Sequence, residues 1–249
     1  MFFKDRLRRD DGVLRGVMSV IPSAVAVQAV AAAGADFIVV DREHGPIGRE
    51  TMHAMIAATA GTDCAALVRV PAVDETEVKV ALDAGAEGIV YPLVRSAEDV
   101  ERCVAYMAYP LEGSRGWGPF VAHSRFRTSL AEYSRAVAPN LTCCVLIETA
   151  EAVENIDAIL AVAGLDLVVL APFDLSTVLG VEGRYDAPVF VEAVARVELA
   201  VAGTTVPLGG VALTHEQSTL LATKGYRLLL HGFDVLMLKE RTAAFKTWR

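Results

Sequence analysis

Short apolar runs and longer amphipathic segments alternate along the chain, and the alternation repeats eight times. The runs are rich in Val, Ile and Leu without a polar residue at every second position, which is typical of strands buried on both faces. The segments between them have the length of helices, and several end at a glycine such as Gly34 or Gly85. The predicted strands are 13–20, 37–41, 65–70, 88–94, 142–147, 167–171, 208–213 and 226–230. The predicted helices that follow them are 22–33, 49–60, 75–84, 97–107, 152–162, 189–202, 216–223 and 235–245.

Eight strand–helix units with apolar strands predict an α/β fold, a single (β/α)8 TIM barrel over residues 1–249. A doubly wound open sheet is the alternative, but the first strand–helix turn lacks the glycine-rich sequence of dinucleotide-binding folds. A short helix is expected at 4–11, before the first strand. Residues 111–128 break the alternation with three glycines and a proline, so we expect a long active-site loop there, followed by a short helix at 129–137.

The composition narrows the range of partners. Asp and Glu outnumber Lys and Arg by 31 to 23, and the resulting net charge of -8 argues against binding to nucleic acid, whose phosphates attract basic surfaces. Hydrophobic residues make up 53% of the chain and the mean hydropathy is +0.40. Because this is high for a monomer, we expect a homo-oligomer.

Two features bear on the compartment. Residues 16–35 carry no charge, but Pro22, Gln28 and Gly34 interrupt them and acidic residues precede them, so we expect neither a membrane segment nor an export signal. The cysteines show no CxxC spacing and most lie in apolar strand-like runs, which predicts buried, reduced thiols and a cytoplasmic protein. They are Cys64, Cys103, Cys143 and Cys144.

Titratable side chains gather where the second predicted strand ends, at Asp41, Glu43 and His44. The C-terminal ends of barrel strands carry the active site in TIM-barrel enzymes. His44 is a candidate general acid or base because its ordinary pKa lies near neutrality, and Asp41 could orient it. The alternative is a hydrogen-bonded core histidine. Asp83, near the end of a predicted helix, is a second possible partner of His44, or else a solvated helix charge.

Two acidic residues follow the fifth and sixth predicted strands, at Glu148 and Asp174. Carboxylates on adjacent strand ends can hold a hard divalent cation such as Mg²⁺ or Mn²⁺, with water and substrate oxygens as the other ligands. The alternative is that each acid caps the helix that follows it. The spacing alone leaves both interpretations open.

Arg69 ends the third predicted strand, where a charge needs a partner. Its guanidinium could bind a substrate carboxylate or polarise a carbonyl, since its donors match pairs of oxygens. A structural ion pair with a neighbouring acid is equally compatible with the sequence.

These residues occur in motifs that resemble the metal-dependent class II pyruvate aldolases of the HpcH/HpaI aldolase/citrate lyase family. The resemblance covers most of the chain, and the motifs arrive in order at predicted strand ends. They are DREHGP at 41–46, VRVP at 68–71, LDAGA at 82–86, GSRG at 113–116, IETAEAVEN at 147–155 and PFDLS at 172–176.

The resemblance implies a TIM barrel of the phosphoenolpyruvate/pyruvate type, assembled as a hexamer or trimer. It implies reversible aldol addition of the enolate of pyruvate, or a similar 2-oxo acid, to an aldehyde. Glu148 and Asp174 then resemble the ligands of Mg²⁺ or Mn²⁺, with Co²⁺ as a further option, and Glu43 resembles a group near metal-bound water. No lysine ends a predicted strand, so a Schiff-base aldolase is not expected.

The resemblance also assigns roles to four further side chains. Arg69 resembles the arginine that contacts the 2-oxo acid and stabilises the enolate oxygen. His44 resembles the acid/base residue that acts on the aldehyde oxygen through water. Asp41, or Asp83 from a neighbouring subunit, is expected to assist it.

Three aromatic residues depart from the family pattern. Phe173 precedes Asp174 where relatives commonly have alanine, Phe233 lies in a turn that relatives build from small residues, and Trp117 follows the GSRG motif. If they face the pocket, Phe173 and Trp117 contact the substrate, and all three narrow the pocket or favour apolar aldehydes. Packing beneath the loops is the alternative.

Two other functions remain compatible with the sequence. An acyl-CoA lyase of the citrate-lyase type would use the same enolate chemistry on a thioester, and would need a basic patch near the pocket mouth. A barrel without catalytic activity, with Phe173 blocking the metal site, would instead serve as a binding or scaffold subunit.

Overall fold

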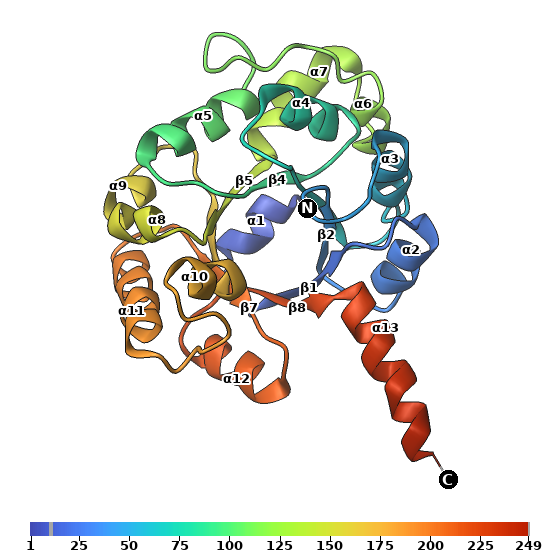
Figure 1. The fold of residues 1–249 in the computed structure, drawn as a ribbon. Coiled ribbons are helices and arrows are strands. Elements are labelled where there is room, and N and C mark those ends of the chain that lie inside the picture. Colours follow the sequence, from blue (N-terminus) through green and yellow to red (C-terminus); the bar gives the residue numbers. More distant parts are fainter. Residues whose placement is uncertain (10–11, 249) are drawn as a thin grey trace.

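Eight parallel strands close into one barrel in the computed structural model, which describes residues 1–9 and 12–248. Each strand pairs with the next along the chain, and the last pairs with the first (Figure 1). The predicted TIM barrel is therefore confirmed. The strands are β1 Leu14–Ser19, β2 Phe37–Asp41, β3 Ala65–Arg69, β4 Gly88–Tyr91, β5 Thr142–Ile147, β6 Leu167–Leu170, β7 Leu208–Val211 and β8 Leu228–Phe233.

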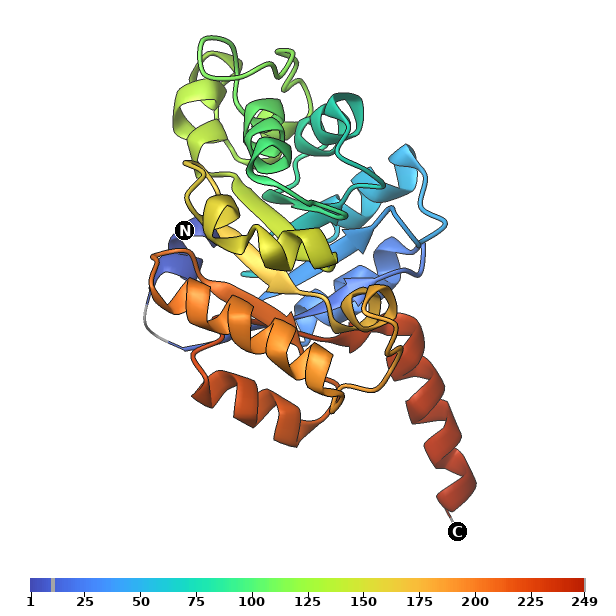
Figure 2. The same cartoon turned by 60° about the vertical axis from the view of Figure 1, so that its left-hand side comes forward.

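Helices surround the barrel, as the two ribbon views show (Figures 1 and 2). They are α1 Phe3–Arg8, α2 Ala24–Ala32, α3 Arg49–Ala57, α4 Glu75–Asp83, α5 Ala97–Met107, α6 Ala122–Arg125, α7 Leu130–Ala136, α8 Ala150–Glu154, α9 Ile156–Leu160, α10 Pro172–Val178, α11 Pro188–Ala202, α12 His215–Thr223 and α13 Asp234–Ala243. Two 3₁₀ turns, η1 Ala138–Asn140 and η2 Ala244–Thr247, complete the described elements.

The strands are apolar on both faces because each face meets its own core. Residues that point inward, such as Phe37 and Leu67, form one cluster inside the barrel, and residues that point outward pack against the helices. The short helix α1 adds Phe3 and Leu7 to the inner cluster and so closes the N-terminal end of the barrel. The opposite end is left for the strand ends and the loops that follow them.

Several boundaries differ from the prediction for identifiable reasons. Strand β4 ends at Tyr91 rather than residue 94, because Pro92 lacks a backbone N–H and Leu93 has a φ of 56°. The predicted helix 152–162 is two short helices, α8 and α9, that meet at Asn155. The predicted helix 4–11 is observed as α1, and residues 10 and 11 lie outside the described residues.

Two short helices were not expected. Helix α10 begins at Pro172, between the predicted strand 167–171 and the predicted helix 189–202, and α6 lies within the predicted loop 111–128. Arg115 of this loop is fully buried and paired with Asp83 of α4, so the loop packs against the helical layer.

The thiols and the helix lengths also bear on earlier expectations. All four cysteines are buried and free, as predicted. Among residues 1–9 and 12–248, no helix is long and apolar enough to cross a membrane.

Helix α13 projects away from the barrel with the C-terminus at its far end (Figures 1 and 2).

Candidate active site

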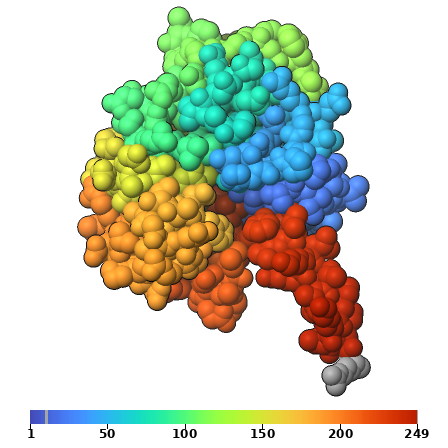
Figure 3. Space-filling view, viewed as in Figure 1, coloured from blue at the N-terminus to red at the C-terminus, as the bar shows by residue number. Residues whose placement is uncertain are grey.

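Several of the predicted site residues lie together at the C-terminal end of the barrel because the strands bring them there. Asp41 and Arg69 are the last residues of β2 and β3 and are paired in register. Glu148 follows β5, and Asp174 is the third residue of α10, which follows β6. A cavity of about 470 Å³ opens at this end and is lined by Asp41, Arg69 and Asp174, together with His44 at its edge. Figure 3 shows the molecule hollowed here, beside the red start of α13.

Arg69 is held in place by two acids. Its Nε and Nη2 donate hydrogen bonds of 2.9 and 2.7 Å to the two carboxylate oxygens of Asp41. Its Nη1 lies 3.0 Å from Glu43 Oε2. Burial works against the charge of Arg69, but the hydrogen bonds and charge of Asp41 outweigh it and raise the pKa of the guanidinium. The predicted ion pair is therefore present, and it fixes the guanidinium at the cavity.

Asp41 does not orient the imidazole of His44, contrary to one expectation. Its Oδ1 accepts hydrogen bonds from Arg69 and from the backbone N–H groups of Glu43 and His44, at 3.0 and 3.2 Å for the latter two. The His44 side chain is 64% exposed, and its Nε2 lies 3.8 Å from Glu43 Oε2. His44 is thus no core residue, and its nearest acidic neighbour is Glu43.

Glu148 is buried beneath the cavity, where one backbone group binds it. The N–H of Leu93 donates a 2.6 Å hydrogen bond to Glu148 Oε1. The pKa of Glu148 is raised to about 7. Burial is the largest cause, and the charges of Asp174 and Glu43 add to it, whereas the Leu93 hydrogen bond and the charge of Arg69 lower the pKa. Leu93 has left-handed backbone geometry with φ of 56°, which costs free energy in a residue other than glycine and often marks a functional site.

The two acids are not helix caps, so that alternative is wrong. Thr149, rather than Glu148, caps α8 by accepting a hydrogen bond from the N–H of Ala152. The cap position of α10 is Ala171, and Asp174 lies inside the first turn without a side-chain capping bond. Asp174 lines the cavity, whereas Glu148 is 2% exposed and is not among the described lining residues.

The donor set fits a divalent cation. Four carboxylates face a single guanidinium, and Oε2 of Glu43 is buried without a hydrogen-bond partner in the described structure. Burial raises the pKa of Glu43 even though Arg69 lowers it. Carboxylate oxygens are preferred by hard cations. Among residues 1–9 and 12–248, no group of three or more His, Cys, Asp or Glu side chains is arranged to hold a metal ion.

Comparison with known proteins identifies the family. The model of the HpcH/HpaI aldolase/citrate lyase family matches residues 19–240. The chain belongs to this family. A hydroxypyruvate/pyruvate aldolase of Agrobacterium fabrum is 36% identical over 165 residues, which are 66% of this chain and 62%, or less than two thirds, of that protein. A hydroxypyruvate/pyruvate aldolase of Roseovarius nubinhibens is 31% identical, over 96% of this chain and 92% of that protein.

Solved structures agree with this assignment. A family member from Burkholderia cenocepacia J2315 matches with a TM-score of 0.90 and 29% identity, covering 99% of this chain and 98% of that one. The citrate lyase β subunit of M. tuberculosis, solved with oxaloacetate and magnesium, shares the fold with a TM-score of 0.59 and 16% identity, covering 92% and 93% of the two chains.

Two expected site residues of this family member lie elsewhere. Asp83 is half-buried and pairs with Arg115 at 2.6 Å, and burial raises its pKa although Arg115 lowers it, so it is no solvated helix charge. Trp117 donates a 3.2 Å hydrogen bond to Ser134 and packs edge-on against Phe120. Neither Asp83 nor Trp117, nor any other residue of 111–128, is among the described residues that line the cavity.

The other two unusual aromatics do line the cavity. Phe173 and Phe233 both line it, and Phe173 is 43% exposed. The Leu93 N–H was missed by sequence reasoning, and no pattern of side chains could have revealed a donor that belongs to the backbone.

Proposed function

We propose that this protein is a divalent-metal-dependent aldolase that reversibly adds the enolate of pyruvate, or a similar 2-oxo acid, to an aldehyde. One observation carries the proposal. A guanidinium fixed by Asp41 and Glu43 lies in the same cavity as Asp174, beside the buried carboxylate of Glu148. The combination of the Arg69 guanidinium with the carboxylates of Glu148 and Asp174 suits a substrate with adjacent carboxylate and ketone oxygens.

Arg69 binds and orients the 2-oxo acid. A guanidinium has five N–H donors, and two of those of Arg69 bind Asp41, while Nη1 forms an ion pair with Glu43 without a hydrogen bond, so three donors remain for the substrate. Their positive charge stabilises negative charge that develops on the ketone oxygen when a proton leaves C3. Because Asp41 already holds the guanidinium of Arg69 in place, the side chain needs little reorganisation when the substrate binds.

Glu148 and Asp174 would hold the divalent ion, Mg²⁺ or Mn²⁺, with Co²⁺ as a further option. When bound, such an ion supplies Lewis acidity that makes the C3 protons of a 2-oxo acid easier to remove. Glu43, with one carboxylate oxygen free of hydrogen bonds, would bind water beside these ligands.

His44 handles the proton on the aldehyde side. It lies at the exposed edge of the cavity, and its imidazole can give a proton to the new hydroxyl oxygen, directly or through water. In the cleavage direction it takes that proton back. The resemblance also predicts help from Asp83 of a neighbouring subunit, and this stays a prediction.

Deuterium exchange at the pyruvate methyl group tests the function directly by NMR. We expect exchange with Mg²⁺ or Mn²⁺, its loss on adding EDTA, and its return with excess metal. Asp174→Asn should abolish exchange, whereas Asp157→Asn, which changes an exposed aspartate paired with Arg196, should leave it intact. Exchange no faster than in protein-free buffer at saturating Mn²⁺ would refute the proposed function.

We also propose that the protein is a homo-oligomer, a hexamer or trimer. Helix α13 projects from the barrel and exposes large apolar side chains, which are Val235, Met237, Leu238, and beyond the helix Phe245 and Trp248. Apolar surface of this kind favours subunit contacts. Light scattering after gel filtration gives the mass, and a monomer at micromolar concentration would contradict the proposal.

A further inference from the structure

The reaction cavity has one charged side and one apolar side. Its charged or titratable lining residues are Asp41, His44, Arg69 and Asp174, all near the ends of β2, β3 and β6. The remaining described lining residues are apolar side chains and Gly232, and they come largely from β1, α10, β7 and β8. The 2-oxo acid takes the charged side, so the aldehyde has to meet the apolar one.

A second cavity of about 280 Å³ adjoins the first. Phe173 and Val211 line both cavities, so they form the boundary between them. The second cavity is walled by Tyr185, Phe190 and Leu220, among others. We call the apolar side of the reaction cavity together with this second cavity the acceptor groove.

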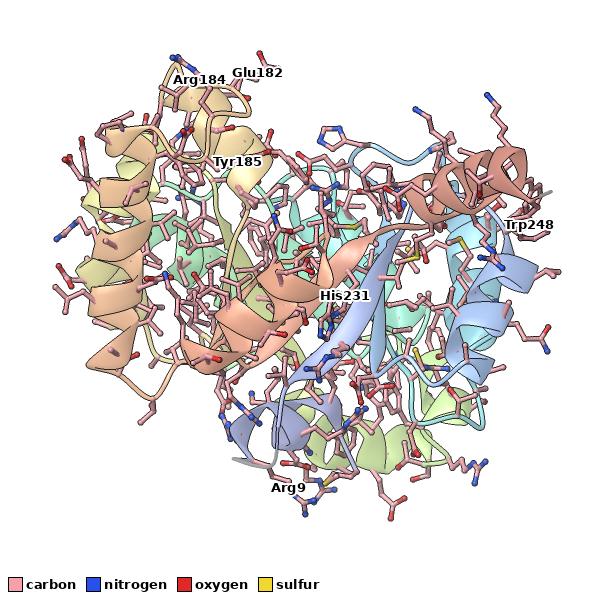
Figure 4. The ribbon with its side chains drawn as sticks, turned by 90° about the horizontal axis from the view of Figure 1, so that it is seen from below. Arg9, Glu182, Arg184, Tyr185, His231 and Trp248 are labelled. Carbon is pink, nitrogen blue, oxygen red and sulfur yellow. The ribbon has the colours of Figure 1, made fainter. Side chains whose placement is uncertain are left out.

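Aromatic rings form one wall of the acceptor groove. The ring centroids of Phe173 and Tyr185 lie 6.4 Å apart, and those of Tyr185 and Phe190 lie 5.4 Å apart. Figure 4 places Tyr185 on the connection that follows α10, below Glu182 and Arg184, which lie at the edge of the molecule. The charged residues of this connection therefore do not form the wall.

Polar groups in the groove are few. Gln217 lines the second cavity, but its Oε1 accepts hydrogen bonds from the N–H groups of Leu213 and Thr214 at the start of α12. Among the described lining residues of both cavities, Arg69 is the only lysine or arginine, and His44 lies on the charged side of the reaction cavity. It is already engaged by Asp41, Glu43 and the 2-oxo acid. A carboxylate on the aldehyde would thus lie against apolar surface without a counter-charge, which is unfavourable.

The groove also presents apolar side chains to solvent. Phe173 is 43% exposed and Leu220 is 57% exposed. Covering such surface with an apolar ligand is favourable, and Phe173 and Val211, which line both cavities, place such a ligand next to the reaction cavity.

We propose that the aldehyde substrate carries an uncharged, straight apolar chain, which runs from the reaction cavity past Phe173 and Val211 along the acceptor groove. This inference rests on the aldolase function proposed above. In the addition, a proton leaves C3 of the 2-oxo acid to a base, and C3 forms a bond to the aldehyde carbon. The aldehyde oxygen becomes a hydroxyl by taking one proton from the His44 side, so no atom leaves and nothing is oxidised or reduced.

A series of aldehydes tests the chain length. With saturating pyruvate and Mn²⁺, kcat/KM is measured for propanal, butanal, pentanal and hexanal, and for succinic semialdehyde as the charged counterpart of pentanal. Full burial of one methylene corresponds to roughly a fourfold gain, so a partly open groove should give about two- to threefold per methylene. We expect hexanal to exceed propanal roughly tenfold or more, and pentanal to exceed succinic semialdehyde by a similar factor.

A charge placed in the groove tests its position. Leu220→Lys, on α12, should lower the hexanal-to-propanal ratio of kcat/KM at least fivefold. The matched control is Leu199→Lys, which changes a leucine that is 79% exposed on α11 and should leave the ratio unchanged. Equal ratios in the two variants would show that the chain does not lie along Leu220 and would overturn the proposal.

Pyruvate deuterium exchange separates the two levels of inference because it needs no aldehyde. Metal-dependent exchange with a flat chain-length series, or with a preference for succinic semialdehyde, would refute the acceptor groove and leave the aldolase function standing. Absence of exchange would refute the function itself, and the inference about the groove with it.

Discussion

Replacing Arg69 with lysine keeps the positive charge but removes the pair of guanidinium donors that binds Asp41. The two hydrogen bonds of 2.9 and 2.7 Å to a buried carboxylate cannot both be made by an ammonium group in the same geometry. Losing one charge-assisted hydrogen bond costs about 1.5–3 kcal/mol of stability. In a chain of this length, such a loss of stability lowers Tm by roughly 3–12 °C, a shift that differential scanning calorimetry would detect. Full removal in Arg69→Ala would leave Asp41 unpaired and cost more, about 3–5 kcal/mol.

The effect on catalysis should exceed the effect on stability. The lysine has no pair of donors left for the ketone and carboxylate oxygens, so we expect pyruvate deuterium exchange to slow by about 100-fold or more, as for the loss of a preorganised donor. Arg42→Lys is the matched control, because Arg42 forms a comparable part-buried ion pair with Glu77 outside the cavity. It should lose stability and keep exchange. Wild-type exchange in Arg69→Lys would remove this residue from the mechanism.

Three further predictions follow from other parts of the structure. Glu148→Gln should weaken Mn²⁺ binding at least tenfold by titration calorimetry and stop pyruvate exchange, and unchanged binding would exclude Glu148 as a ligand. His44→Ala should slow carbon–carbon cleavage far more than exchange, since His44 acts on the aldehyde side; equal losses in both assays would contradict that division. Because burial raises the pKa of Cys64 and Cys103 to about 12, only about one thiol in ten thousand is ionised at pH 8, so neither should react with a disulfide reagent until the protein unfolds. Rapid labelling of the native protein would show that these thiols are accessible.

The barrel and its strand ends were predictable because hydrophobic periodicity encodes burial directly. The C-terminal end of β2 was placed correctly at Asp41, and that of β3 was placed one residue beyond Arg69, since an apolar run is interrupted by a charge at each of these positions. Helix α10 was missed, since no helix was predicted between residues 171 and 189, although proline, here Pro172, is favoured at the first position of a helix. Sequence alone could therefore locate Asp174 but not the helical turn that holds it.

The partners of the charged residues could not be predicted, because pairing depends on distances across strands. Arg69 had several acids within reach of its strand end, and only the register of β2 with β3 sets Asp41 directly beside it. For Asp83, the sequence offered no indication of Arg115 as a partner, because Arg115 lies in the segment 111–128, which was predicted to be an active-site loop. The hydrogen bond from the Leu93 N–H to Glu148 could not be predicted, since the direction of this N–H depends on a backbone conformation that side-chain identity does not encode.

Asp41 links the two halves of the proposed reaction. One of its carboxylate oxygens binds Arg69 and also the backbone N–H groups of Glu43 and His44, so the same group sets the guanidinium and the path of the chain that carries the histidine. The other oxygen accepts a hydrogen bond from Nη2 of Arg69, so both oxygens of the carboxylate are engaged. We therefore propose that Asp41 is a positioning residue and that the acid–base step falls to the exposed imidazole of His44, whose Nε2 lies 3.8 Å from Glu43 Oε2.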